Sequence, residues 1–309
     1  MKLINDSIIT IRNEISNLKW SEHRKIGGLK HKEVCFYVIR RRSKDVGLFS
    51  YVLSNLGHIK YAEEKNWIPV IDMKNYPNSY LEKDAKENAW EYFFMQPRGY
   101  RLEDIKYSRN IILSSGDTKK PYPGYEILKD ENVLNEWKKI YKNNIYINYN
   151  TQNYIEQVEK EVFKGHKNIL GVLCRGTDYV ALQPQGHPRQ PEVQQVITKV
   201  KNVMENKNFE YVYLATEDSD ILEEFKKIFK EKLLFVNVPP RKYDRNKLIT
   251  QIEIDRANDK IIKGKEYLGQ VYLLSKCRGI IAAGCGGTYG ALLMNKQYEY
   301  KFFWDLGIY

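Results

Sequence analysis

The second half of the chain alternates short apolar runs with amphipathic segments of helical period. The apolar runs lie at residues 168–174, 211–215, 233–236 and 279–283. Segments with apolar residues at every third or fourth position lie at residues 155–163, 193–203, 221–229 and 265–276. Apolar strands that alternate with such helices are typical of a parallel sheet covered on both faces. The sequence therefore predicts a Rossmann-like α/β unit in this half.

The first half shows the same alternation less regularly. Residues 34–39 and 68–72 are apolar runs typical of strands, and residues 48–62 between them have a helical period. Residues 76–128 are rich in proline, glycine and aromatic side chains, and the pattern assigns no regular element to them.

The length of 309 residues exceeds one ordinary core, so two domains are expected. An Asn- and Tyr-rich stretch at residues 142–153 marks the boundary. We therefore expect an α/β protein with two Rossmann-like domains facing a cleft, formed by residues 1–152 and residues 153–309.

The charge and motif content of the sequence indicate which kinds of partner to expect. The 50 basic residues outnumber the 39 acidic ones, which favours an anionic partner. No zinc-finger spacing or aromatic RNA-binding motif is present, so no nucleic acid is expected. No apolar run is long enough to span a membrane, although the basic charge suits loose attachment to an anionic membrane surface. The four cysteines form no CxxC pair, and we expect a cytoplasmic protein, with attachment at the inner face of the cell membrane left open.

Arg175 and a long loop follow the apolar run at residues 168–174. Ligands of open parallel sheets bind beyond the carboxyl ends of the strands, so this position is a candidate binding site. An arginine there can direct two donors at a phosphate, whereas an ion pair with Asp178 is the structural alternative. His187, further along the loop, is a candidate base or an ordinary solvated histidine.

A glycine-rich segment, residues 282–290, follows the last apolar run and opens a helix. Glycines let main-chain N–H groups approach an anion, and a helix N-terminus adds partial positive charge. The spacing matches neither a Walker A loop nor a GxGxxG fingerprint. Candidate diphosphate ligands are Cys285, Gly286, Gly287 and Thr288. A tight turn that needs glycine for packing is the alternative.

Asp218-Ser219-Asp220 resembles the DxD sequence that holds a metal against a diphosphate in many nucleotide-sugar transferases. The same residues stand where a helix is predicted to begin, and an Asp or Ser there caps the helix. Capping is the preferred interpretation. We expect no metal site and no other cofactor.

Three segments resemble motifs of the GDP-fucose-dependent fucosyltransferase superfamily, which includes core α-1,6-fucosyltransferases and protein O-fucosyltransferases. Residues 171–178, GVLCRGTD, resemble its segment GVHVRRTD, and residues 211–218, YVYLATED, resemble VYLATDD. Residues 273–286 resemble a third motif, FLSQAD…SS. The three occur in the family's order. Gly47-Leu48-Phe49-Ser50 is a weaker match to its N-terminal glycine loop.

The resemblance implies a GT-B fold, inverting transfer without a metal, and an arginine, Arg175, that binds the donor diphosphate. It places Thr177, Thr216 and Gln270 beside the donor, and Gly47 and Phe49 on the acceptor side of the cleft. Asp178 and His187 compete for the role of general base.

Several positions depart from the family pattern. Leu173 replaces a nucleotide-contacting His, Gly176 replaces a second Arg, Gln270 falls near a guanine-contacting Asp, Tyr179 and Gln183 replace a Lys and a Glu, and Cys285-Gly286 replaces a serine pair. The Glu is the base proposed for the family, so that group is not retained.

We therefore expect an inverting glycosyltransferase that moves a sugar, first of all L-fucose from GDP-fucose, onto a glycan hydroxyl in bacterial cell-surface polysaccharide synthesis. Two alternatives stay open. One is a transferase of the same fold with a GDP-deoxyheptose or rhamnose-type donor. The other is a non-catalytic module that binds a glycan or nucleotide on a degenerate transferase scaffold.

Overall fold

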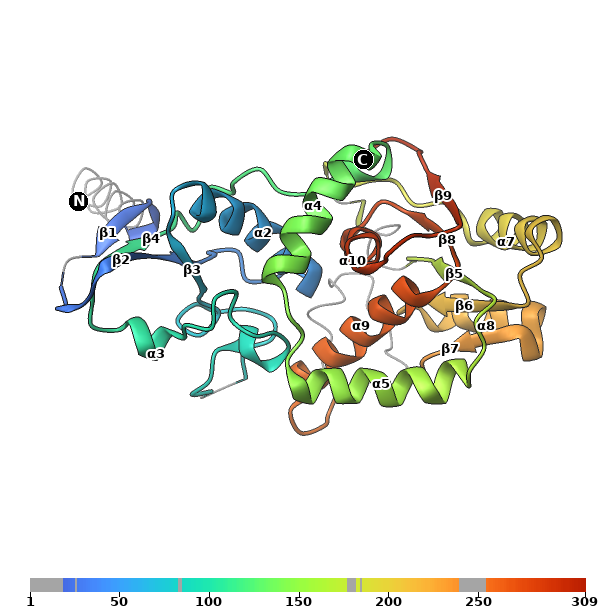
Figure 1. Cartoon of the computed structure of the whole chain (residues 1–309). Coiled ribbons are helices and arrows are strands. Elements are labelled where there is room, and N and C mark those ends of the chain that lie inside the picture. The colour runs from blue at the N-terminus through green and yellow to red at the C-terminus, as the bar shows by residue number, and fades with distance from the viewer. Residues whose placement is uncertain (1–18, 26, 83–84, 177–181, 184, 239–253) are drawn as a thin grey trace, which may run out of the picture.

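The computed structural model describes residues 19–25, 27–82, 85–176, 182–183, 185–238 and 254–309. Figure 1 shows two α/β parts side by side, with helices between their sheets. The first part contains β1 (His23–Lys25), β2 (Lys30–Ile39), α2 (Leu48–Glu64), β3 (Ile68–Ile71), η1 (Ala89–Tyr92), α3 (Leu102–Ile105), β4 (Ser108–Leu113), η2 (Tyr125–Leu128) and α4 (Glu131–Asn144). The second part contains α5 (Tyr149–Phe163), β5 (Ile169–Leu173), α7 (Val193–Lys207), β6 (Tyr211–Ala215), α8 (Ser219–Phe229), η3 (Lys230–Lys232), β7 (Leu233–Phe235), α9 (Asp259–Lys276), β8 (Gly279–Ala283), α10 (Gly286–Met294) and β9 (Tyr300–Trp304).

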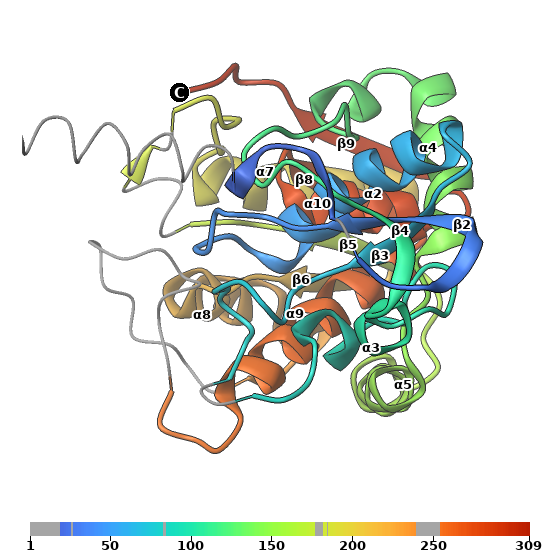
Figure 2. The same cartoon turned by 90° about the vertical axis from the view of Figure 1, so that its left-hand side faces the viewer.

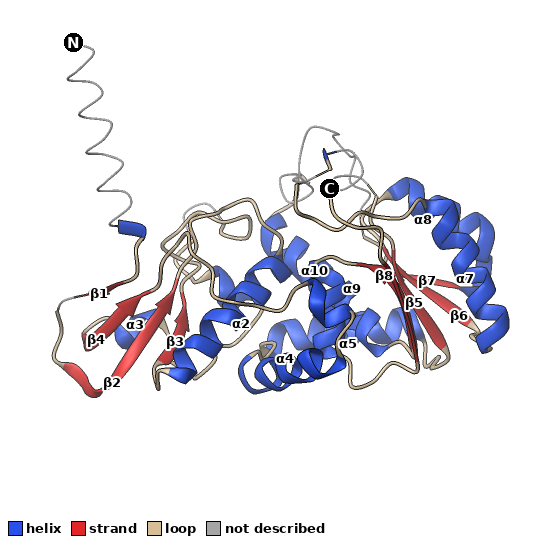
Figure 3. Ribbon diagram, turned by 90° about the horizontal axis from the view of Figure 1, so that it is seen from above, coloured by secondary structure: helices blue, strands red, loops and turns tan. Residues whose placement is uncertain are grey.

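The second sheet is parallel throughout, in the order β7-β6-β5-β8-β9. Helices α7 and α8 cover one face, and α5, α9 and α10 cover the other (Figure 3). Strands β5 and β8 are buried along their whole length, which explains why their sequences are apolar without alternation. The Rossmann-like prediction for this half is confirmed.

The first sheet has the order β1-β4-β2-β3, and β1 is antiparallel to β4 while the other pairs are parallel. Helix α2 packs on one face and α3 on the other. Strand β4 lies in the stretch to which the sequence assigned no element. Its first three residues, Ser108-Arg109-Asn110, are polar, and only apolar residues that follow them join the cluster packed against α3 and β2.

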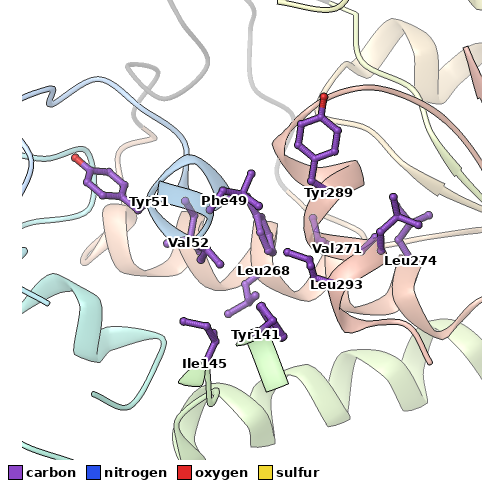
Figure 4. Close-up of a cluster of buried hydrophobic side chains, with 14 of the residues drawn as sticks. Phe49, Tyr51, Val52, Tyr141, Ile145, Leu268, Val271, Leu274, Tyr289 and Leu293 are labelled. Atoms are coloured by element: carbon purple, nitrogen blue, oxygen red, sulfur yellow. The ribbon is translucent and has the colours of Figure 1, made fainter. Parts of the chain in front are cut away.

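One apolar core joins the two parts. Side chains of α2 and α4 pack with those of α9 and α10 in a single buried cluster (Figure 4). Seen from the first part, β2, β4 and α2 lie in front of α9 and α10 (Figure 2). The expected division at residues 152 and 153 falls inside α5, a continuous helix that packs on α9. None of the described helices is both long and apolar enough to cross a membrane.

Phe49, in the first turn of α2, fits against the glycines of α10. Its ring is 1% exposed, and a Cβ built on Gly290 would lie 2.3 Å from two atoms of that ring. The ring also meets Tyr267 of α9 edge-on, with the ring centroids 5.7 Å apart. A side chain at position 290 would therefore separate α2 from α10.

We expect Gly290→Ala to destabilise the protein. Overpacking a close contact costs about 1–3 kcal/mol, and the higher helix propensity of alanine returns only about 1 kcal/mol. Gly269→Ala in α9 is the matched control, because its added Cβ would meet side chains only at 3.7 and 3.8 Å. Urea unfolding should show a lower midpoint for Gly290→Ala and an equal or higher midpoint for Gly269→Ala. Equal midpoints for the two variants would contradict the close fit of Phe49.

Candidate functional site

A pocket of about 180 Å³ opens beyond the carboxyl ends of β6 and β7 and against α9. Its lining residues are Thr216, Glu217, Asp218, Ser219, Leu222, Glu223, Lys226, Asn237, Val238, Lys263, Glu266, Tyr267 and Gln270. Two of the expected donor-binding residues, Thr216 and Gln270, are thus brought to one pocket. The position agrees with the rule that parallel sheets bind ligands at this edge.

Helix α9 contributes buried polar side chains to this pocket. Lys263, Glu266 and Gln270 are 5–7% exposed and lie three and four residues apart, so they share one face of the helix. Arg256 donates two hydrogen bonds to the Glu266 carboxylate, at 2.7 and 2.8 Å, and one to Asp259 at 2.6 Å. These contacts fix the carboxylate at the wall of the pocket.

Sequence reasoning missed Lys263 and Glu266. The available signal was a run of polar residues at helical spacing within a helix whose other faces are apolar. That pattern is also typical of an ordinary solvated face, so the sequence alone did not distinguish the two.

Arg175 lies two residues beyond β5 and contacts a residue that lines the same pocket. Its side chain is 16% exposed, and its guanidinium is 3.7 Å from the carboxylate of Glu217, which lines the pocket. Burial raises the pKa of the Tyr267 hydroxyl well above its usual value, while the charge of Arg175 opposes this shift and that of Glu217 adds to it. The Tyr267 hydroxyl is therefore a neutral donor close to both charges. Within the described residues Glu217 is an acidic partner of Arg175, and the expected alternative partner, Asp178, lies outside those residues.

In the glycine-rich turn, the polar side chains form hydrogen bonds within the turn itself. Thr288 donates to the carbonyl oxygen of Ala283 at 2.6 Å, and the Cys285 sulfur lies 3.4 Å from the Thr288 hydroxyl. Cys285 is the N-cap of α10, but its side chain caps no main-chain N–H group. The candidate ligands in this turn are thus the main-chain N–H groups of the first helical turn.

Packing also requires the glycines of this turn. A Cβ on Gly287 would lie 3.0 Å from both Leu173 Cδ1 and the Tyr267 hydroxyl, and one on Gly286 would lie 3.3 Å from Phe49 Cβ. The sequence posed packing and anion binding as alternatives. In the structure, neighbouring side chains fill the space that a Cβ at these positions would occupy, so packing by itself requires small residues here.

The N-terminus of α2 lies against that of α10. Gly47 is the N-cap of α2 and provides no side-chain cap, and a Cβ on Gly286 would lie 3.8 Å from the Ser50 nitrogen. Gly47 borders open space, whereas the Phe49 ring is buried between the two parts. Two helix N-termini without side-chain caps therefore add their partial positive charges at the junction.

Asp218 caps α8, as expected. Its Oδ1 accepts hydrogen bonds from the main-chain nitrogens of Asp220 at 2.9 Å and Ile221 at 3.2 Å. A Cβ on Gly176 would lie 2.4 Å from Asp218 Oδ2, so a side chain at position 176 would have to displace that carboxylate. Among the described residues, no three His, Cys, Asp or Glu side chains gather as a metal site.

Of the two proposed bases, the structure describes His187 but not Asp178. The expected donor-binding residue Thr177 also lies outside the described residues. His187 is exposed, on a segment whose main chain pairs with residues 307–309 at the C-terminus. The same segment reaches the glycine-rich turn, because Gln190 donates to the Gly284 carbonyl oxygen at 3.2 Å. The role of His187 as a base stays a prediction.

The fold is similar to that of solved fucosyltransferases. Fucosyltransferase NodZ from Bradyrhizobium has a TM-score of 0.50 at 17% identity, with 84% of this chain and 94% of that chain covered. NodZ alpha-1,6-fucosyltransferase co-crystallised with GDP has a TM-score of 0.51 at 17% identity, covering 84% and 93%. POFUT1 in complex with GDP-fucose has a TM-score of 0.50 at 9% identity, covering 91% and 100%.

Neither a protein-family model nor a curated protein sequence matches the chain. The chain has the GT-B fold of these fucosyltransferases, as the sequence motifs implied.

Capping and metal binding by Asp218 predict different effects of substitution. Asparagine caps a helix as well as aspartate does, so Asp218→Asn should keep the stability of the protein, whereas Asp218→Ala should lose about 0.5–2 kcal/mol. Thermal unfolding of both variants measures this difference.

Chelation provides the matching test on activity. We expect saturating EDTA to leave sugar-nucleotide turnover unchanged, and Asp218→Asn to retain it. Loss of turnover with EDTA and its return with Mg²⁺ or Mn²⁺ would show that these carboxylates are ligands and not only caps.

Proposed function

We propose that the protein is an inverting, metal-independent glycosyltransferase that moves a sugar from a nucleoside-diphosphate donor onto a glycan hydroxyl. GDP-fucose is the proposed donor, and synthesis of a bacterial cell-surface polysaccharide is the proposed setting. The observation that supports this most strongly is the arrangement around the 180 Å³ pocket: Arg175 pairs with Glu217 of its lining, and the charge of Arg175 acts on the Tyr267 hydroxyl, which packs against Gly287 in the first turn of α10.

The pocket suits a nucleobase and ribose. A guanine edge presents two N–H donors and one acceptor oxygen, and the pocket offers the Glu266 carboxylate and the Lys263 and Gln270 donors at one wall. The hydroxyl and carboxylate groups between the carboxyl end of β6 and the start of α8 can bind the ribose. The GDP and GDP-fucose complexes of the similar structures agree with this assignment of the donor.

The diphosphate would lie where positive charge is concentrated. In the transfer step the acceptor oxygen forms a bond to the anomeric carbon, and the bond from that carbon to the β-phosphate oxygen breaks. Negative charge then develops on the leaving diphosphate, and fixed donors directed at it lower the barrier. Arg175 and the N–H groups of Gly286, Gly287 and Thr288 are the donors proposed for this role.

The acceptor hydroxyl must also lose a proton. Asp178 and His187 are the proposed bases, and Gly47, with open space before α2, is proposed to border the acceptor. Gln270 in the pocket, at the position where the family has an Asp, favours one second candidate: the same reaction with another GDP-linked deoxy sugar.

A panel of nucleotides tests the identity of the donor. We expect GDP to raise the midpoint of thermal unfolding more than ADP, UDP, CDP or TDP, because a ligand at 100 times its Kd stabilises by about 2.7 kcal/mol. Guanosine should stabilise less than GDP, since it lacks the diphosphate. Equal shifts with every nucleotide, or none with any, would contradict the proposed donor pocket.

Activity assays then separate the donors. Slow hydrolysis of GDP-fucose and of other GDP-linked deoxy sugars should show which sugar is turned over. Selective binding of GDP without turnover of any sugar nucleotide, with or without acceptors, would favour the non-catalytic alternative.

Arg175→Ala should reduce the rate of transfer on the order of a hundredfold, because one charge-assisted donor to the leaving group contributes roughly 3 kcal/mol. The loss should appear in kcat. The fold should survive because the Arg175 side chain is partly exposed. Arg175→Lys is the control that retains the charge, and it should recover part of the rate. Near-native turnover by Arg175→Ala would contradict the role.

A further inference from the structure

A second cavity, of about 90 Å³, lies at the carboxyl edge of the first sheet. The loops that follow β2 and β4 form its walls together with one face of α2. It shares no lining residue with the 180 Å³ pocket.

Two consecutive arginines, Arg40 and Arg41, line this cavity at the end of β2. Arg40 is 3% exposed and donates to the carbonyl oxygens of Ser114 and Ser21 at 2.6 and 2.8 Å. Arg41 donates to the carbonyl oxygen of Ser50 at 2.9 Å and to the hydroxyls of Ser50 and Ser54 at 3.2 Å. These partners are neutral oxygens, so none of them compensates the two charges.

Two buried donors at the cavity lack partners. Within the described part of the chain, neither the Nε of Arg41 nor the Nδ2 of Asn55 has a hydrogen-bond partner. Asn55 is 4% exposed and lines this cavity and a smaller neighbouring one, as Arg41 also does. A buried donor without a partner destabilises the protein, more when it is charged, so a ligand that accepts from both would remove that cost.

The charges around the cavity favour an anion. Lys119 adds a third positive charge to the lining, and the one carboxylate among the described lining residues, Asp117, pairs with Arg42 at 3.3 Å. His58 adds none at neutral pH, because burial and the charge of Lys120 lower its pKa to about 4. The cavity therefore combines excess positive charge with unused donors.

The residues of α2 that line the cavity lie on a different face of the helix from Phe49. His58 follows Phe49 by nine residues, which is about two and a half turns, and Phe49 faces α10. Arg41 bonds Ser50 in the first turn of α2, so the cavity extends from that turn along the face of α2 that turns away from α10.

We propose that the cavity at Arg41 and Asn55 binds an anionic group of the acceptor, a carboxylate or a phosphate, so that the acceptor is an acidic glycan. The identification of the ligand as the acceptor rests on the proposed function, whereas the anion site itself does not. Bidentate recognition by a guanidinium and an amide donor suits the planar oxygens of a carboxylate and also the oxygens of a phosphate.

Calorimetric titration of the full chain saturated with GDP tests the site, because GDP then occupies the donor pocket. The probes are methyl β-D-glucuronate, inorganic phosphate and the neutral methyl β-D-glucoside, in a buffer of low chloride. We expect saturable binding of at least one anion and none of the glucoside. The anion that binds more tightly identifies whether a sugar carboxylate or a phosphate is the natural group.

Arg41→Gln and Asn55→Asp should each weaken anion binding about tenfold or more, while the Kd of GDP stays within about twofold. Asn55→Asp keeps the size of the side chain and places a carboxylate beside Arg41, so it tests the site even if Arg41→Gln fails to fold. Arg109→Gln removes the same charge from an exposed position at the other end of the first sheet, and its binding should match the wild type.

Three results would overturn the proposal: no saturable binding with or without GDP, equal binding by the wild type and both variants, or anion binding that is seen without GDP and lost when GDP is present. The last would assign the anion to the donor site. If GDP itself does not bind, the proposed function fails, and the same titration without nucleotide still decides the anion site. Once transfer is observed, an acidic oligosaccharide should have a KM about tenfold below that of its carboxyl-reduced form, and Arg41→Gln should remove the difference.

Discussion

The packing of Phe49 against α10 is the contact on which the rest of the site depends. Burying such a ring stabilises a protein by about 1.5–3 kcal/mol, and here the gain depends on glycine at position 290 of α10, while a Cβ at position 286 would also come within 3.3 Å of Phe49 Cβ. Since Phe49 belongs to the first turn of α2 and Gly286 to the first turn of α10, the same contact joins the two parts of the molecule and places both helix N-termini together. An apolar interaction thereby determines where the positive end of each helix dipole points.

The pocket beside α9, the junction and the cavity of the first part differ in their charges, and each therefore suits a different kind of ligand group. The pocket beside α9 contains both signs of charge, with Glu266 held by Arg256 next to Lys263, which suits the mixed donors and acceptors of a nucleobase. At the junction, positive charge comes from main-chain dipoles and Arg175. In the first part, Arg40 and Arg41 have only neutral partners. A donor with a diphosphate and an acceptor with its own anion would use separate positive groups, which limits repulsion between them.

The sequence predicted the second sheet well because its strands are buried on both faces and differ sharply from the helices between them. It assigned no strand to β4 or β9, because β4 begins with three polar residues and Lys301 interrupts the apolar residues of β9. It predicted the cap at Asp218 and the positions of Arg175 and the glycine-rich turn beyond the ends of strands, whereas the roles of the latter two in binding stay predictions. It missed the buried polar face of α9, because burial of Glu266 depends on Arg256, a contact between helix and loop that local periodicity does not encode.

The glycine-rich turn shows why sequence left packing and anion binding as competing explanations. Both require a main chain without Cβ atoms at the start of a helix, and both therefore give the same residue pattern. In the structure the two requirements act on different sides of the same residues: the missing Cβ of Gly287 makes room for Leu173 and Tyr267, while the first N–H groups of α10 have no side-chain cap. Close packing is what brings α2, α9 and α10 together around those N–H groups. A pattern that satisfies both needs is then stronger support for a built anion site than glycine alone, because the packing fixes the donors before a ligand arrives.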